Sequence, residues 1–288
     1  MYRELVSLGP VTIHTFGAMM ALGFMASLFV LDRMNKRFSV LPPGCEISGV
    51  MMNLLLAGIA GARICHVVEY WHQDGFDKDW LSIFMVWNGG LVFYGGFAGA
   101  VAAFLAMYFR RRGKIGFFEF SDFILVALPL GHAFGRLGCF FNGCCFGRLA
   151  SECGRAGEIF GLSFPPLSDA SYTQWKAGLL SSPALKSLPV LPSQLFEASA
   201  LLLLFAILLL AYLRFHGRRP GVVTGLYFCG YGVFRFCLEY MRGDDRPANA
   251  LFSSAQMFSM PLVAVGAVFA LLALKNRLRR RKADCSRD

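Results

Sequence analysis

Apolar residues gather in long, nearly uncharged stretches along this chain, and short polar segments separate them. Seven such stretches are each long enough, or nearly so, to cross a hydrocarbon layer about 30 Å thick. They lie near residues 11–31, 47–68, 89–109, 117–138, 195–213, 221–241 and 251–274. The pattern therefore predicts an all-α integral membrane protein with seven transmembrane helices, formed by one polytopic domain over residues 1–288.

The composition agrees with a membrane protein. Of the 288 residues, 56% are hydrophobic and only 16% are charged, which is too few charges to cover the surface of a water-soluble protein. The first ten residues, MYRELVSLGP, lack the basic lead of a cleavable signal peptide. We therefore expect the first apolar stretch to be retained as a span.

The basic residues are unevenly distributed between alternate loops. One set of loops, with the C-terminal tail, holds 17 Lys and Arg residues, whereas the other set holds 8. The positive-inside rule then places the N-terminus outside and the C-terminus in the cytoplasm. The basic excess behind the net charge of +10 therefore mostly sets orientation, and attraction to anionic lipids is secondary. A nucleic-acid partner is not expected.

Two segments differ from simple spans and short loops. The sequence NGGLVFYGG at 88–96 is rich in glycine, which favours a re-entrant turn that lines a cavity. The segment 139–194 is long, with prolines and serines that suggest irregular structure, while Tyr172 and Trp175 suggest that it packs against something. We expect this segment to form a small head on the outer side of the membrane.

Three arginines lie within the apolar stretches: Arg63, Arg136 and Arg235. Each would cost roughly 2.5–3.5 kcal/mol at a helix centre facing lipid. Asp122 and Glu239 are the available acidic partners, and Glu239 follows Arg235 by four residues, which allows a local ion pair on one helical face. Three residues further on, Arg242 continues that face.

Arg136 has no acidic residue within helical reach. Gly135 and Gly138 stand beside it and would let another backbone or a ligand approach closely. Both Arg136 and Arg235 fall near the outer headgroup layer in the predicted topology, and a guanidinium donates two parallel hydrogen bonds to a phosphate. The pattern indicates a phospholipid headgroup site, with snorkelling towards the interface as the alternative for Arg136.

Four cysteines, Cys139, Cys144, Cys145 and Cys153, lie at or beyond the predicted outer surface. An oxidising compartment would permit a disulfide between them; small packing residues, or a metal or redox site, are the alternatives. Their spacing matches no strong metal motif, and no histidine occurs between 133 and 215. We therefore predict no metal and no cofactor, and the sequence leaves the pairing of these thiols open.

The stretch GRLGCFFNGCCFGR at 135–148 resembles the signature of the prolipoprotein diacylglyceryl transferases, and further blocks resemble that family in the same order. These blocks are LGPVTIHTFG (8–17), GARICHVVEY (61–70), WNGGLVFYGG (87–96), SDFILVALPLG (121–131), LPSQLFEA (191–198), GYGVFRFCLEYMR (230–242) and AQMFSMP (255–261). The resemblance covers nearly the whole chain.

The resemblance implies a multi-pass enzyme of the bacterial cytoplasmic (inner) membrane. Such an enzyme transfers the diacylglyceryl group of phosphatidylglycerol to the lipobox cysteine of a preprolipoprotein, forms a thioether and releases glycerol phosphate. The partners it implies are phosphatidylglycerol, the lipobox peptide and membrane lipids.

The resemblance also implies roles for particular residues. Arg136 and Arg235 match the family's essential arginines, Asn142 and Gly147 match its signature, and Glu239 and Arg242 match its arginine–glutamate–arginine helix. We therefore predict that the last four, with the two arginines and His14, bind phosphatidylglycerol.

The sequence offers more than one candidate for the general base. Tyr94 stands where the family typically has a histidine, so it is predicted to be catalytic with Arg136 and Arg235, as a base or by orienting the phosphate. His14 and His132 are alternative bases. Further departures from the family pattern are Phe16, Phe196, Leu191 and Cys139.

Three other functions remain open at this point. Cys144 and Cys145 could cycle in a membrane thiol–disulfide or quinone oxidoreductase. Arg136 and Arg235 could form the site of an anion transporter. A divergent paralogue could keep the fold and use another acceptor.

Overall fold

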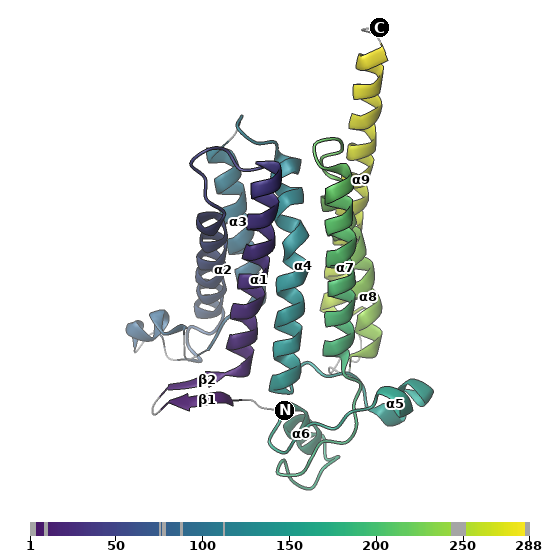
Figure 1. Cartoon of the computed structure of the whole chain (residues 1–288). Coiled ribbons are helices and arrows are strands. Elements are labelled where there is room, and N and C mark those ends of the chain that lie inside the picture. The colour runs from purple at the N-terminus through teal and green to yellow at the C-terminus, as the bar shows by residue number, and fades with distance from the viewer. Residues whose placement is uncertain are drawn as a thin grey trace. The chain divides into compact units, whose positions relative to one another are not determined.

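The structure, a computed structural model, describes residues 4–8, 11–74, 76, 79–86, 89–111, 113–242 and 252–285, and helices dominate them (Figure 1). The strands are β1 (Glu4–Leu8) and β2 (Val11–His14), an antiparallel pair. The helices are α1 (Thr15–Phe38), α2 (Ile47–Glu69), η1 (Trp80–Phe84), α3 (Phe93–Arg110), α4 (Phe117–Asn142), η3 (Ala150–Glu152), α5 (Gly154–Phe160), α6 (Asp169–Lys176), α7 (Ser193–Phe215), α8 (Val222–Leu238), η4 (Glu239–Met241) and α9 (Ser254–Cys285).

Six of the described helices are long and apolar enough to cross a membrane. They lie at Thr15–Phe38, Ile47–Glu69, Phe93–Arg110, Phe117–Asn142, Ser193–Phe215 and Ala255–Ala273. This agrees with the prediction of a helical integral membrane protein. The stretch expected near 221–241 forms α8, which has 17 residues, followed by the tighter helix η4.

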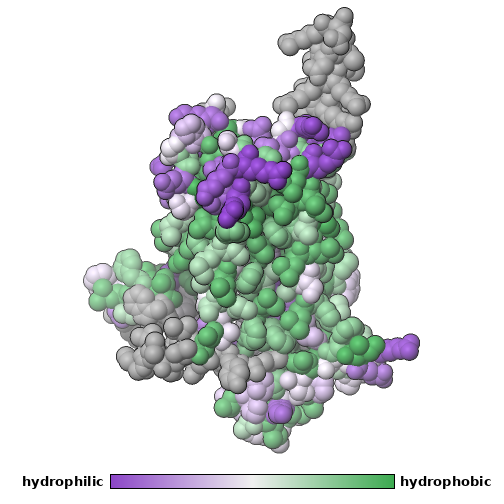
Figure 2. Space-filling model, in the orientation of Figure 1, coloured by the Kyte–Doolittle hydropathy of each residue, from purple (hydrophilic) through white to green (hydrophobic). Residues whose placement is uncertain are grey.

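The helices carry exposed apolar side chains on their outer faces. Leu203 and Leu210 on α7 are 64% and 66% exposed, and Met257 and Leu271 on α9 are each 64% exposed. Figure 2 shows this apolar surface along the helices, and hydrophilic side chains gather at the end where α7 meets α8. An apolar surface of this kind is expected to contact lipid.

The described chain divides into two compact units, one of residues 1–30 and 121–288 and the other of residues 31–120. In the first unit, α1 packs closely against α4 through glycines. A Cβ added to Gly23 would lie 2.7 Å from the Cβ of Phe134, and one added to Gly138 would lie 3.0 Å from the Phe16 ring. The glycines beside Arg136 therefore allow α1 to approach, since Gly135 likewise faces Met20.

Asp122, near the start of α4, holds the first turn of α8. Its Oδ2 accepts a hydrogen bond of 2.7 Å from the backbone N–H of Gly221, and its Oδ1 accepts bonds of 2.7 Å and 2.6 Å from the N–H and hydroxyl of Thr224. A carboxylate at a helix N-terminus satisfies amides that have no partner within the helix. Asp122 thus serves the backbone of α8 and not an arginine.

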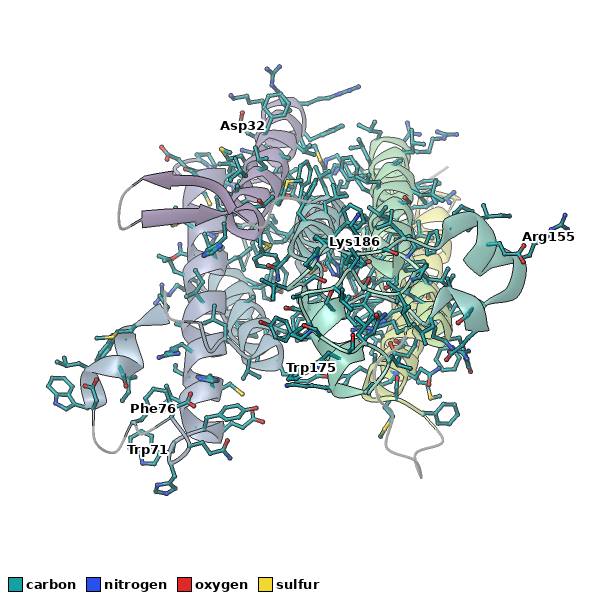
Figure 3. All side chains as sticks on the ribbon, turned by 90° about the horizontal axis from the view of Figure 1, so that it is seen from below. Asp32, Trp71, Phe76, Arg155, Trp175 and Lys186 are labelled. Atoms are coloured by element: carbon teal, nitrogen blue, oxygen red, sulfur yellow. The ribbon has the colours of Figure 1, made fainter. Side chains whose placement is uncertain are left out.

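The segment 139–194 is more ordered than its composition suggested. It contains η3, α5 and α6, and it has a small core of Phe164, Ala170 and Val190. Tyr172 and Trp175 do not belong to that core, because they are 41% and 43% exposed. In Figure 3, Arg155 on α5 extends away from the helices.

In the second unit, α2 and α3 pack backbone to backbone. A Cβ on Gly61 would lie within 2.4 Å of the Gly95 carbonyl oxygen, and one on Gly99 within 2.2 Å of the Ala57 carbonyl oxygen. Small residues at this spacing allow the close approach of membrane helices. Gly95 therefore belongs to a helix contact, while Gly89 and Gly90 have positive φ values of 88° and 71° in the preceding loop.

Arg63 organises the loop between α2 and α3. Its guanidinium donates hydrogen bonds to the backbone carbonyls of Ser82, Ile83, Gly89 and Gly90 at 2.5–3.1 Å. Its carbon Cζ lies 5.4 Å from the centre of the Phe76 ring, and Figure 3 shows Phe76 near Trp71. The role of this arginine is to hold loop carbonyls in place.

Candidate active site

Arg136 pairs with a carboxylate from another helix. Its Nε lies 3.1 Å from Oε1 of Glu197. Arg136 is one and a half turns before the end of α4, and Glu197 is in the second turn of α7. The Glu197 side chain is 2% exposed and that of Arg136 is 17% exposed, so both charges are largely removed from solvent.

Glu197 was not found from the sequence. Glu197 is 61 positions away from Arg136, so no spacing along a single helix relates the two residues. The sequence does contain a usable sign, since Glu197 is the lone acidic residue of LPSQLFEA and of the apolar stretch that follows. An isolated carboxylate in a membrane span needs a partner.

Arg235 and Glu239 form the local ion pair that their spacing permits. Arg235 Nη1 lies 2.8 Å from Glu239 Oε2 across the end of α8. Arg136, Arg235 and Arg242 all interact electrostatically with Glu197. Guanidinium groups from α4, from α8 and from the residue after η4 therefore lie within electrostatic range of one buried carboxylate, and Arg136 contacts it directly.

His132 and Tyr231 lie beside this cluster. His132 is one turn before Arg136 on α4, and its Nε2 is 3.8 Å from Oε1 of Glu197. The centre of its ring lies 5.6 Å from that of Tyr231 on α8, which in turn stacks on Tyr227. Of the two histidines considered as alternative bases, His132 is therefore the one that lies beside the arginines.

Gly147 lies where three segments cross. Its N–H donates to the Leu191 carbonyl at 2.8 Å, and the next N–H, from Arg148, donates to the Met241 carbonyl at 3.0 Å. A Cβ at Gly147 would lie 2.7 Å from the Met241 oxygen and 2.8 Å from the Leu191 oxygen. Only glycine fits here, and the crossing ties the signature stretch to the start of α7 and to Arg242.

Asn142 and the cysteines lie between Arg136 and Gly147. Asn142 is the last residue of α4, and its side chain lies close enough to the thiol of Cys144 to interact with it. Gln194 Nε2 donates to the Cys144 carbonyl at 2.7 Å and Ser193 Oγ to the Cys145 carbonyl at 2.8 Å. The first turn of α7 therefore holds the signature loop.

The thiols of the signature stretch and of Cys153 are free. Among these residues, no disulfide joins Cys139, Cys144, Cys145 or Cys153. The neighbouring thiols of Cys139 and Cys144, and then the guanidinium charges of Arg136 and Arg242, lower the pKa of the Cys145 thiol.

The predicted site residues fall into two groups. Contacts or charge interactions link Arg136, Arg235, Asn142, Gly147, Glu239 and Arg242 within the first unit. His14 lies at the end of β2 with an exposed side chain, paired in the hairpin with Glu4. Tyr94 lies in the first turn of α3, in the second unit, and is 49% exposed.

The linked group is suited to binding an anion. Its guanidinium groups outnumber its carboxylates, and the arginine side chains are mostly buried. In such an environment a phosphate gains more from paired guanidinium donors than it would in water. The same positive groups would stabilise negative charge that develops on a leaving phosphate oxygen.

Comparison with known proteins decides the family. The family model described as prolipoprotein diacylglyceryl transferase matches residues 3–272. The chain belongs to the prolipoprotein diacylglyceryl transferase family.

The alignments with its relatives extend over nearly the whole length of both proteins. A phosphatidylglycerol–prolipoprotein diacylglyceryl transferase of Cronobacter sakazakii is 33% identical over 288 residues, which is 94% of this chain and 92% of the relative. Proteins of the same name from Escherichia coli O1:K1 / APEC and Shigella boydii serotype 18 are each 33% identical over 287 residues, or 93% of this chain and 92% of theirs. The family membership identified from the ordered blocks is therefore confirmed.

Proposed function

We propose that this chain transfers the diacylglyceryl group of phosphatidylglycerol to the cysteine thiol of a prolipoprotein. The observation that carries the proposal is that Arg136 contacts the buried Glu197, while Arg235 and Arg242 lie within electrostatic range of the same carboxylate. The names of its relatives state the same donor and acceptor. The family match does not favour a thiol–disulfide or quinone oxidoreductase that uses Cys144 and Cys145.

The reaction exchanges one bond for another. The substrate sulfur forms a bond to the terminal glycerol carbon of the diacylglyceryl group, and the bond from that carbon to the phosphate oxygen breaks. Glycerol phosphate leaves with the electron pair, and the thiol proton passes to a base or to water. Negative charge grows on the phosphate as the bond breaks, so guanidinium groups already in place bind the transition state more tightly than the ground state.

This geometry supports roles for six of the predicted site residues. Arg136 and Arg235 hold the phosphate, while Glu239 and Arg242 extend the charged face of α8. Asn142 and Gly147 shape the loop against which the headgroup rests. Tyr94, as base or phosphate donor, and His14, as a lipid contact, remain assignments from the resemblance, and substitution of each tests them separately.

We further propose a membrane arrangement for the whole chain. Residues 222–241, α8 with η4, form a seventh span beside the six long apolar helices. Within the predicted turn at 88–96, residue 88 lies outside the described residues and 93–96 open α3, so a re-entrant turn is proposed for residues 89–92. The segment 139–194 is an outer head inserted in a single polytopic domain. The enzyme lies in the bacterial cytoplasmic (inner) membrane with its N-terminus outside and its C-terminus in the cytoplasm.

The test incubates the purified full-length protein with phosphatidylglycerol and a lipobox peptide that contains one cysteine. Mass spectrometry should show a diacylglyceryl group on that cysteine and glycerol phosphate in the aqueous phase. An unmodified peptide after incubation with the correctly folded wild-type protein would contradict the proposal.

Variants of Arg136 distinguish the need for two parallel hydrogen bonds from the need for a positive charge alone. Arg136→Ala should abolish transfer, and Arg136→Lys should recover little, because one ammonium cannot donate two parallel hydrogen bonds. Arg155→Ala is the matched control, since that arginine lies exposed on α5. Equal activity in Arg136→Lys and wild type would argue against phosphate binding by Arg136.

A further inference from the structure

Three thiols gather at the end of α4, and the transferase reaction leaves them without a role. The Sγ atoms of Cys139, Cys144 and Cys145 all lie within 4.8 Å of one another. Each cysteine is only partly exposed. Their spacing in the sequence matched no metal motif, because the gathering depends on how the chain turns after the helix.

The turn and its anchors explain how the thiols meet. Cys139 is in the last turn of α4, and the N–H of Cys144 donates to its carbonyl at 3.2 Å. Gly143 and Cys145 then adopt positive φ values of 76° and 59°, which folds the chain back on the helix end. The first turn of α7 fixes the carbonyls of both later cysteines, as described above.

Three sulfur ligands suit a soft cation. Thiolates select Cu(I), Zn(II) and related ions over hard cations. With metal–sulfur bonds of about 2.3 Å, three sulfurs around a trigonal ion lie about 4 Å apart, so the observed cluster must contract only slightly. The group of metal-ligating side chains identified among the described residues contains these three sulfurs and no fourth ligand, which favours Cu(I) over a four-coordinate structural zinc site.

We propose that Cys139, Cys144 and Cys145 bind one Cu(I) ion as a trigonal thiolate site. Binding breaks three S–H bonds, forms three Cu–S bonds and releases three protons, with no change in the oxidation state of copper or sulfur. The complex carries two negative charges. The guanidinium groups of Arg136 and Arg242 interact electrostatically with Cys145, and that of Arg136 also with Cys139, so positive charge to balance the complex is already present.

The position of the cluster gives copper binding a consequence for catalysis. Cys139 follows Arg136 by three residues on α4. A copper–thiolate complex would attract the same guanidinium groups that are proposed to bind the lipid phosphate. This second step rests on the proposed function: an occupied copper site should weaken the binding of phosphatidylglycerol.

The binding test uses the purified full-length protein, reduced, freed of reductant and kept without oxygen. Cu(I), supplied as its acetonitrile complex, is titrated against a chromophoric Cu(I) chelator, and thiolate-to-copper absorption in the ultraviolet is followed. We expect one ion per chain. Cys139→Ser, Cys144→Ser and Cys145→Ser should each weaken binding by about 100-fold or more, as loss of a direct ligand exceeds the effect of an outer-shell change.

Cys153→Ser is the matched control, because Cys153 lies in the same segment, is partly exposed, and is outside the thiol group. It should bind copper as the wild type does. Wild-type affinity in the three cluster variants, or failure of the wild type to compete with the chelator, would overturn the proposal. So would a disulfide within the cluster that persists in the reduced, copper-free protein.

A second measurement separates this proposal from the proposed function. Transfer is assayed with and without Cu(I), and each protein is compared with its own copper-free activity. The wild type and Cys153→Ser should be inhibited, chiefly through a higher KM for phosphatidylglycerol, and a variant with all three cluster cysteines changed to serine should not. Absent transfer by the copper-free wild type would count against the transferase alone, whereas binding without inhibition would refute the competition for the arginines.

Discussion

At the scale of single residues, the site depends on charges that meet from different helices. Arg136 could be singled out from the sequence because a permanent charge in an apolar stretch is costly. Its partner could not, because the contact with Glu197 is set by the packing of α4 against α7 and not by any spacing along the chain. The Arg235–Glu239 pair was accessible from sequence because both residues share a face of one helix.

Glu197 should therefore matter as much as the arginine it holds. Glu197→Gln removes the charge while keeping the shape of the side chain, and it leaves Arg136 mostly buried without its counter-charge. We expect a loss of about 3 kcal/mol of stability, at the low end for a buried pair because Arg136 retains 17% exposure. Transfer activity should fall at least about tenfold, since the guanidinium of Arg136 is no longer held in one position.

Thermal unfolding in detergent and the peptide transfer assay together check this expectation. Glu158→Gln, an exposed glutamate on α5, is the control and should leave both measurements unchanged. Wild-type stability in Glu197→Gln would show that the pair seen here contributes little.

The cysteines show a different limit of sequence analysis. Their number and spacing left a disulfide, a packing role and a metal or redox site open, and the structure shows free thiols within 4.8 Å of one another. Two positive φ angles bring them together, and no pattern of residue types predicts a positive φ at Cys145, because non-glycine residues rarely adopt it.

At the scale of elements, helices followed directly from apolar length, while their ends and junctions did not. The apolar stretch near 11–31 begins as strand β2 and turns helical at Thr15. The stretch near 221–241 breaks into α8 and η4 close to Glu239. Both differences occur where backbone hydrogen bonds to neighbouring segments replace those of a continuing helix.

The crossing of three segments at Gly147 leads to a prediction about activity. Gly147→Ala would bring a methyl group to 2.7 Å and 2.8 Å from the Met241 and Leu191 carbonyl oxygens. Because both are backbone atoms, the crossing must open, and Arg242 should move away from the arginine cluster. We expect a loss of transfer activity that exceeds the loss of folded protein.

Gly17→Ala provides the control for this substitution. Gly17 is in α1, and a Cβ there meets nothing within 4 Å, so alanine should be tolerated or slightly stabilising in a helix. The kcat and KM for phosphatidylglycerol, measured beside the folded fraction, distinguish the two variants. Wild-type kinetics in Gly147→Ala would mean that the crossing does not position the site.

Substitution of Asp122, in contrast to that of Gly147, should reduce stability and leave the activity of the folded protein unchanged. Carboxylates inside membrane helices are usually functional, but this one accepts three hydrogen bonds at the start of α8. Asp122→Ala leaves buried donors without an acceptor, at about 1–3 kcal/mol each, so the melting temperature should fall. The kcat of the fraction that remains folded should stay near that of the wild type, and a kcat that falls with normal stability would assign Asp122 to catalysis.

At the scale of the whole molecule, charge and hydropathy act together. Apolar side chains cover the helices along their length (Figure 2), so the surface expected to contact lipid could be predicted from composition. The predicted orientation in the membrane rests only on the loops, because one set contains 17 basic residues and the other contains 8. Four of these 8 basic residues lie in the segment 139–194. A long translocated segment can carry basic residues without reversing the topology.

This asymmetry predicts which ends of the spans lie in the cytoplasm, and reporter fusions can measure it. Alkaline phosphatase, which is active only outside the cytoplasm, should be active when inserted after Ser182 in the segment 139–194 and inactive when inserted after Gly113 or fused after Asp288. A fluorescent protein that matures only in the cytoplasm should give the reverse pattern. If the insertion after Ser182 reported a cytoplasmic location, the ends of α4 and α8 that carry Arg136 and Arg235 would face the inner leaflet, and a thiol acceptor presented outside the cell membrane could not reach them.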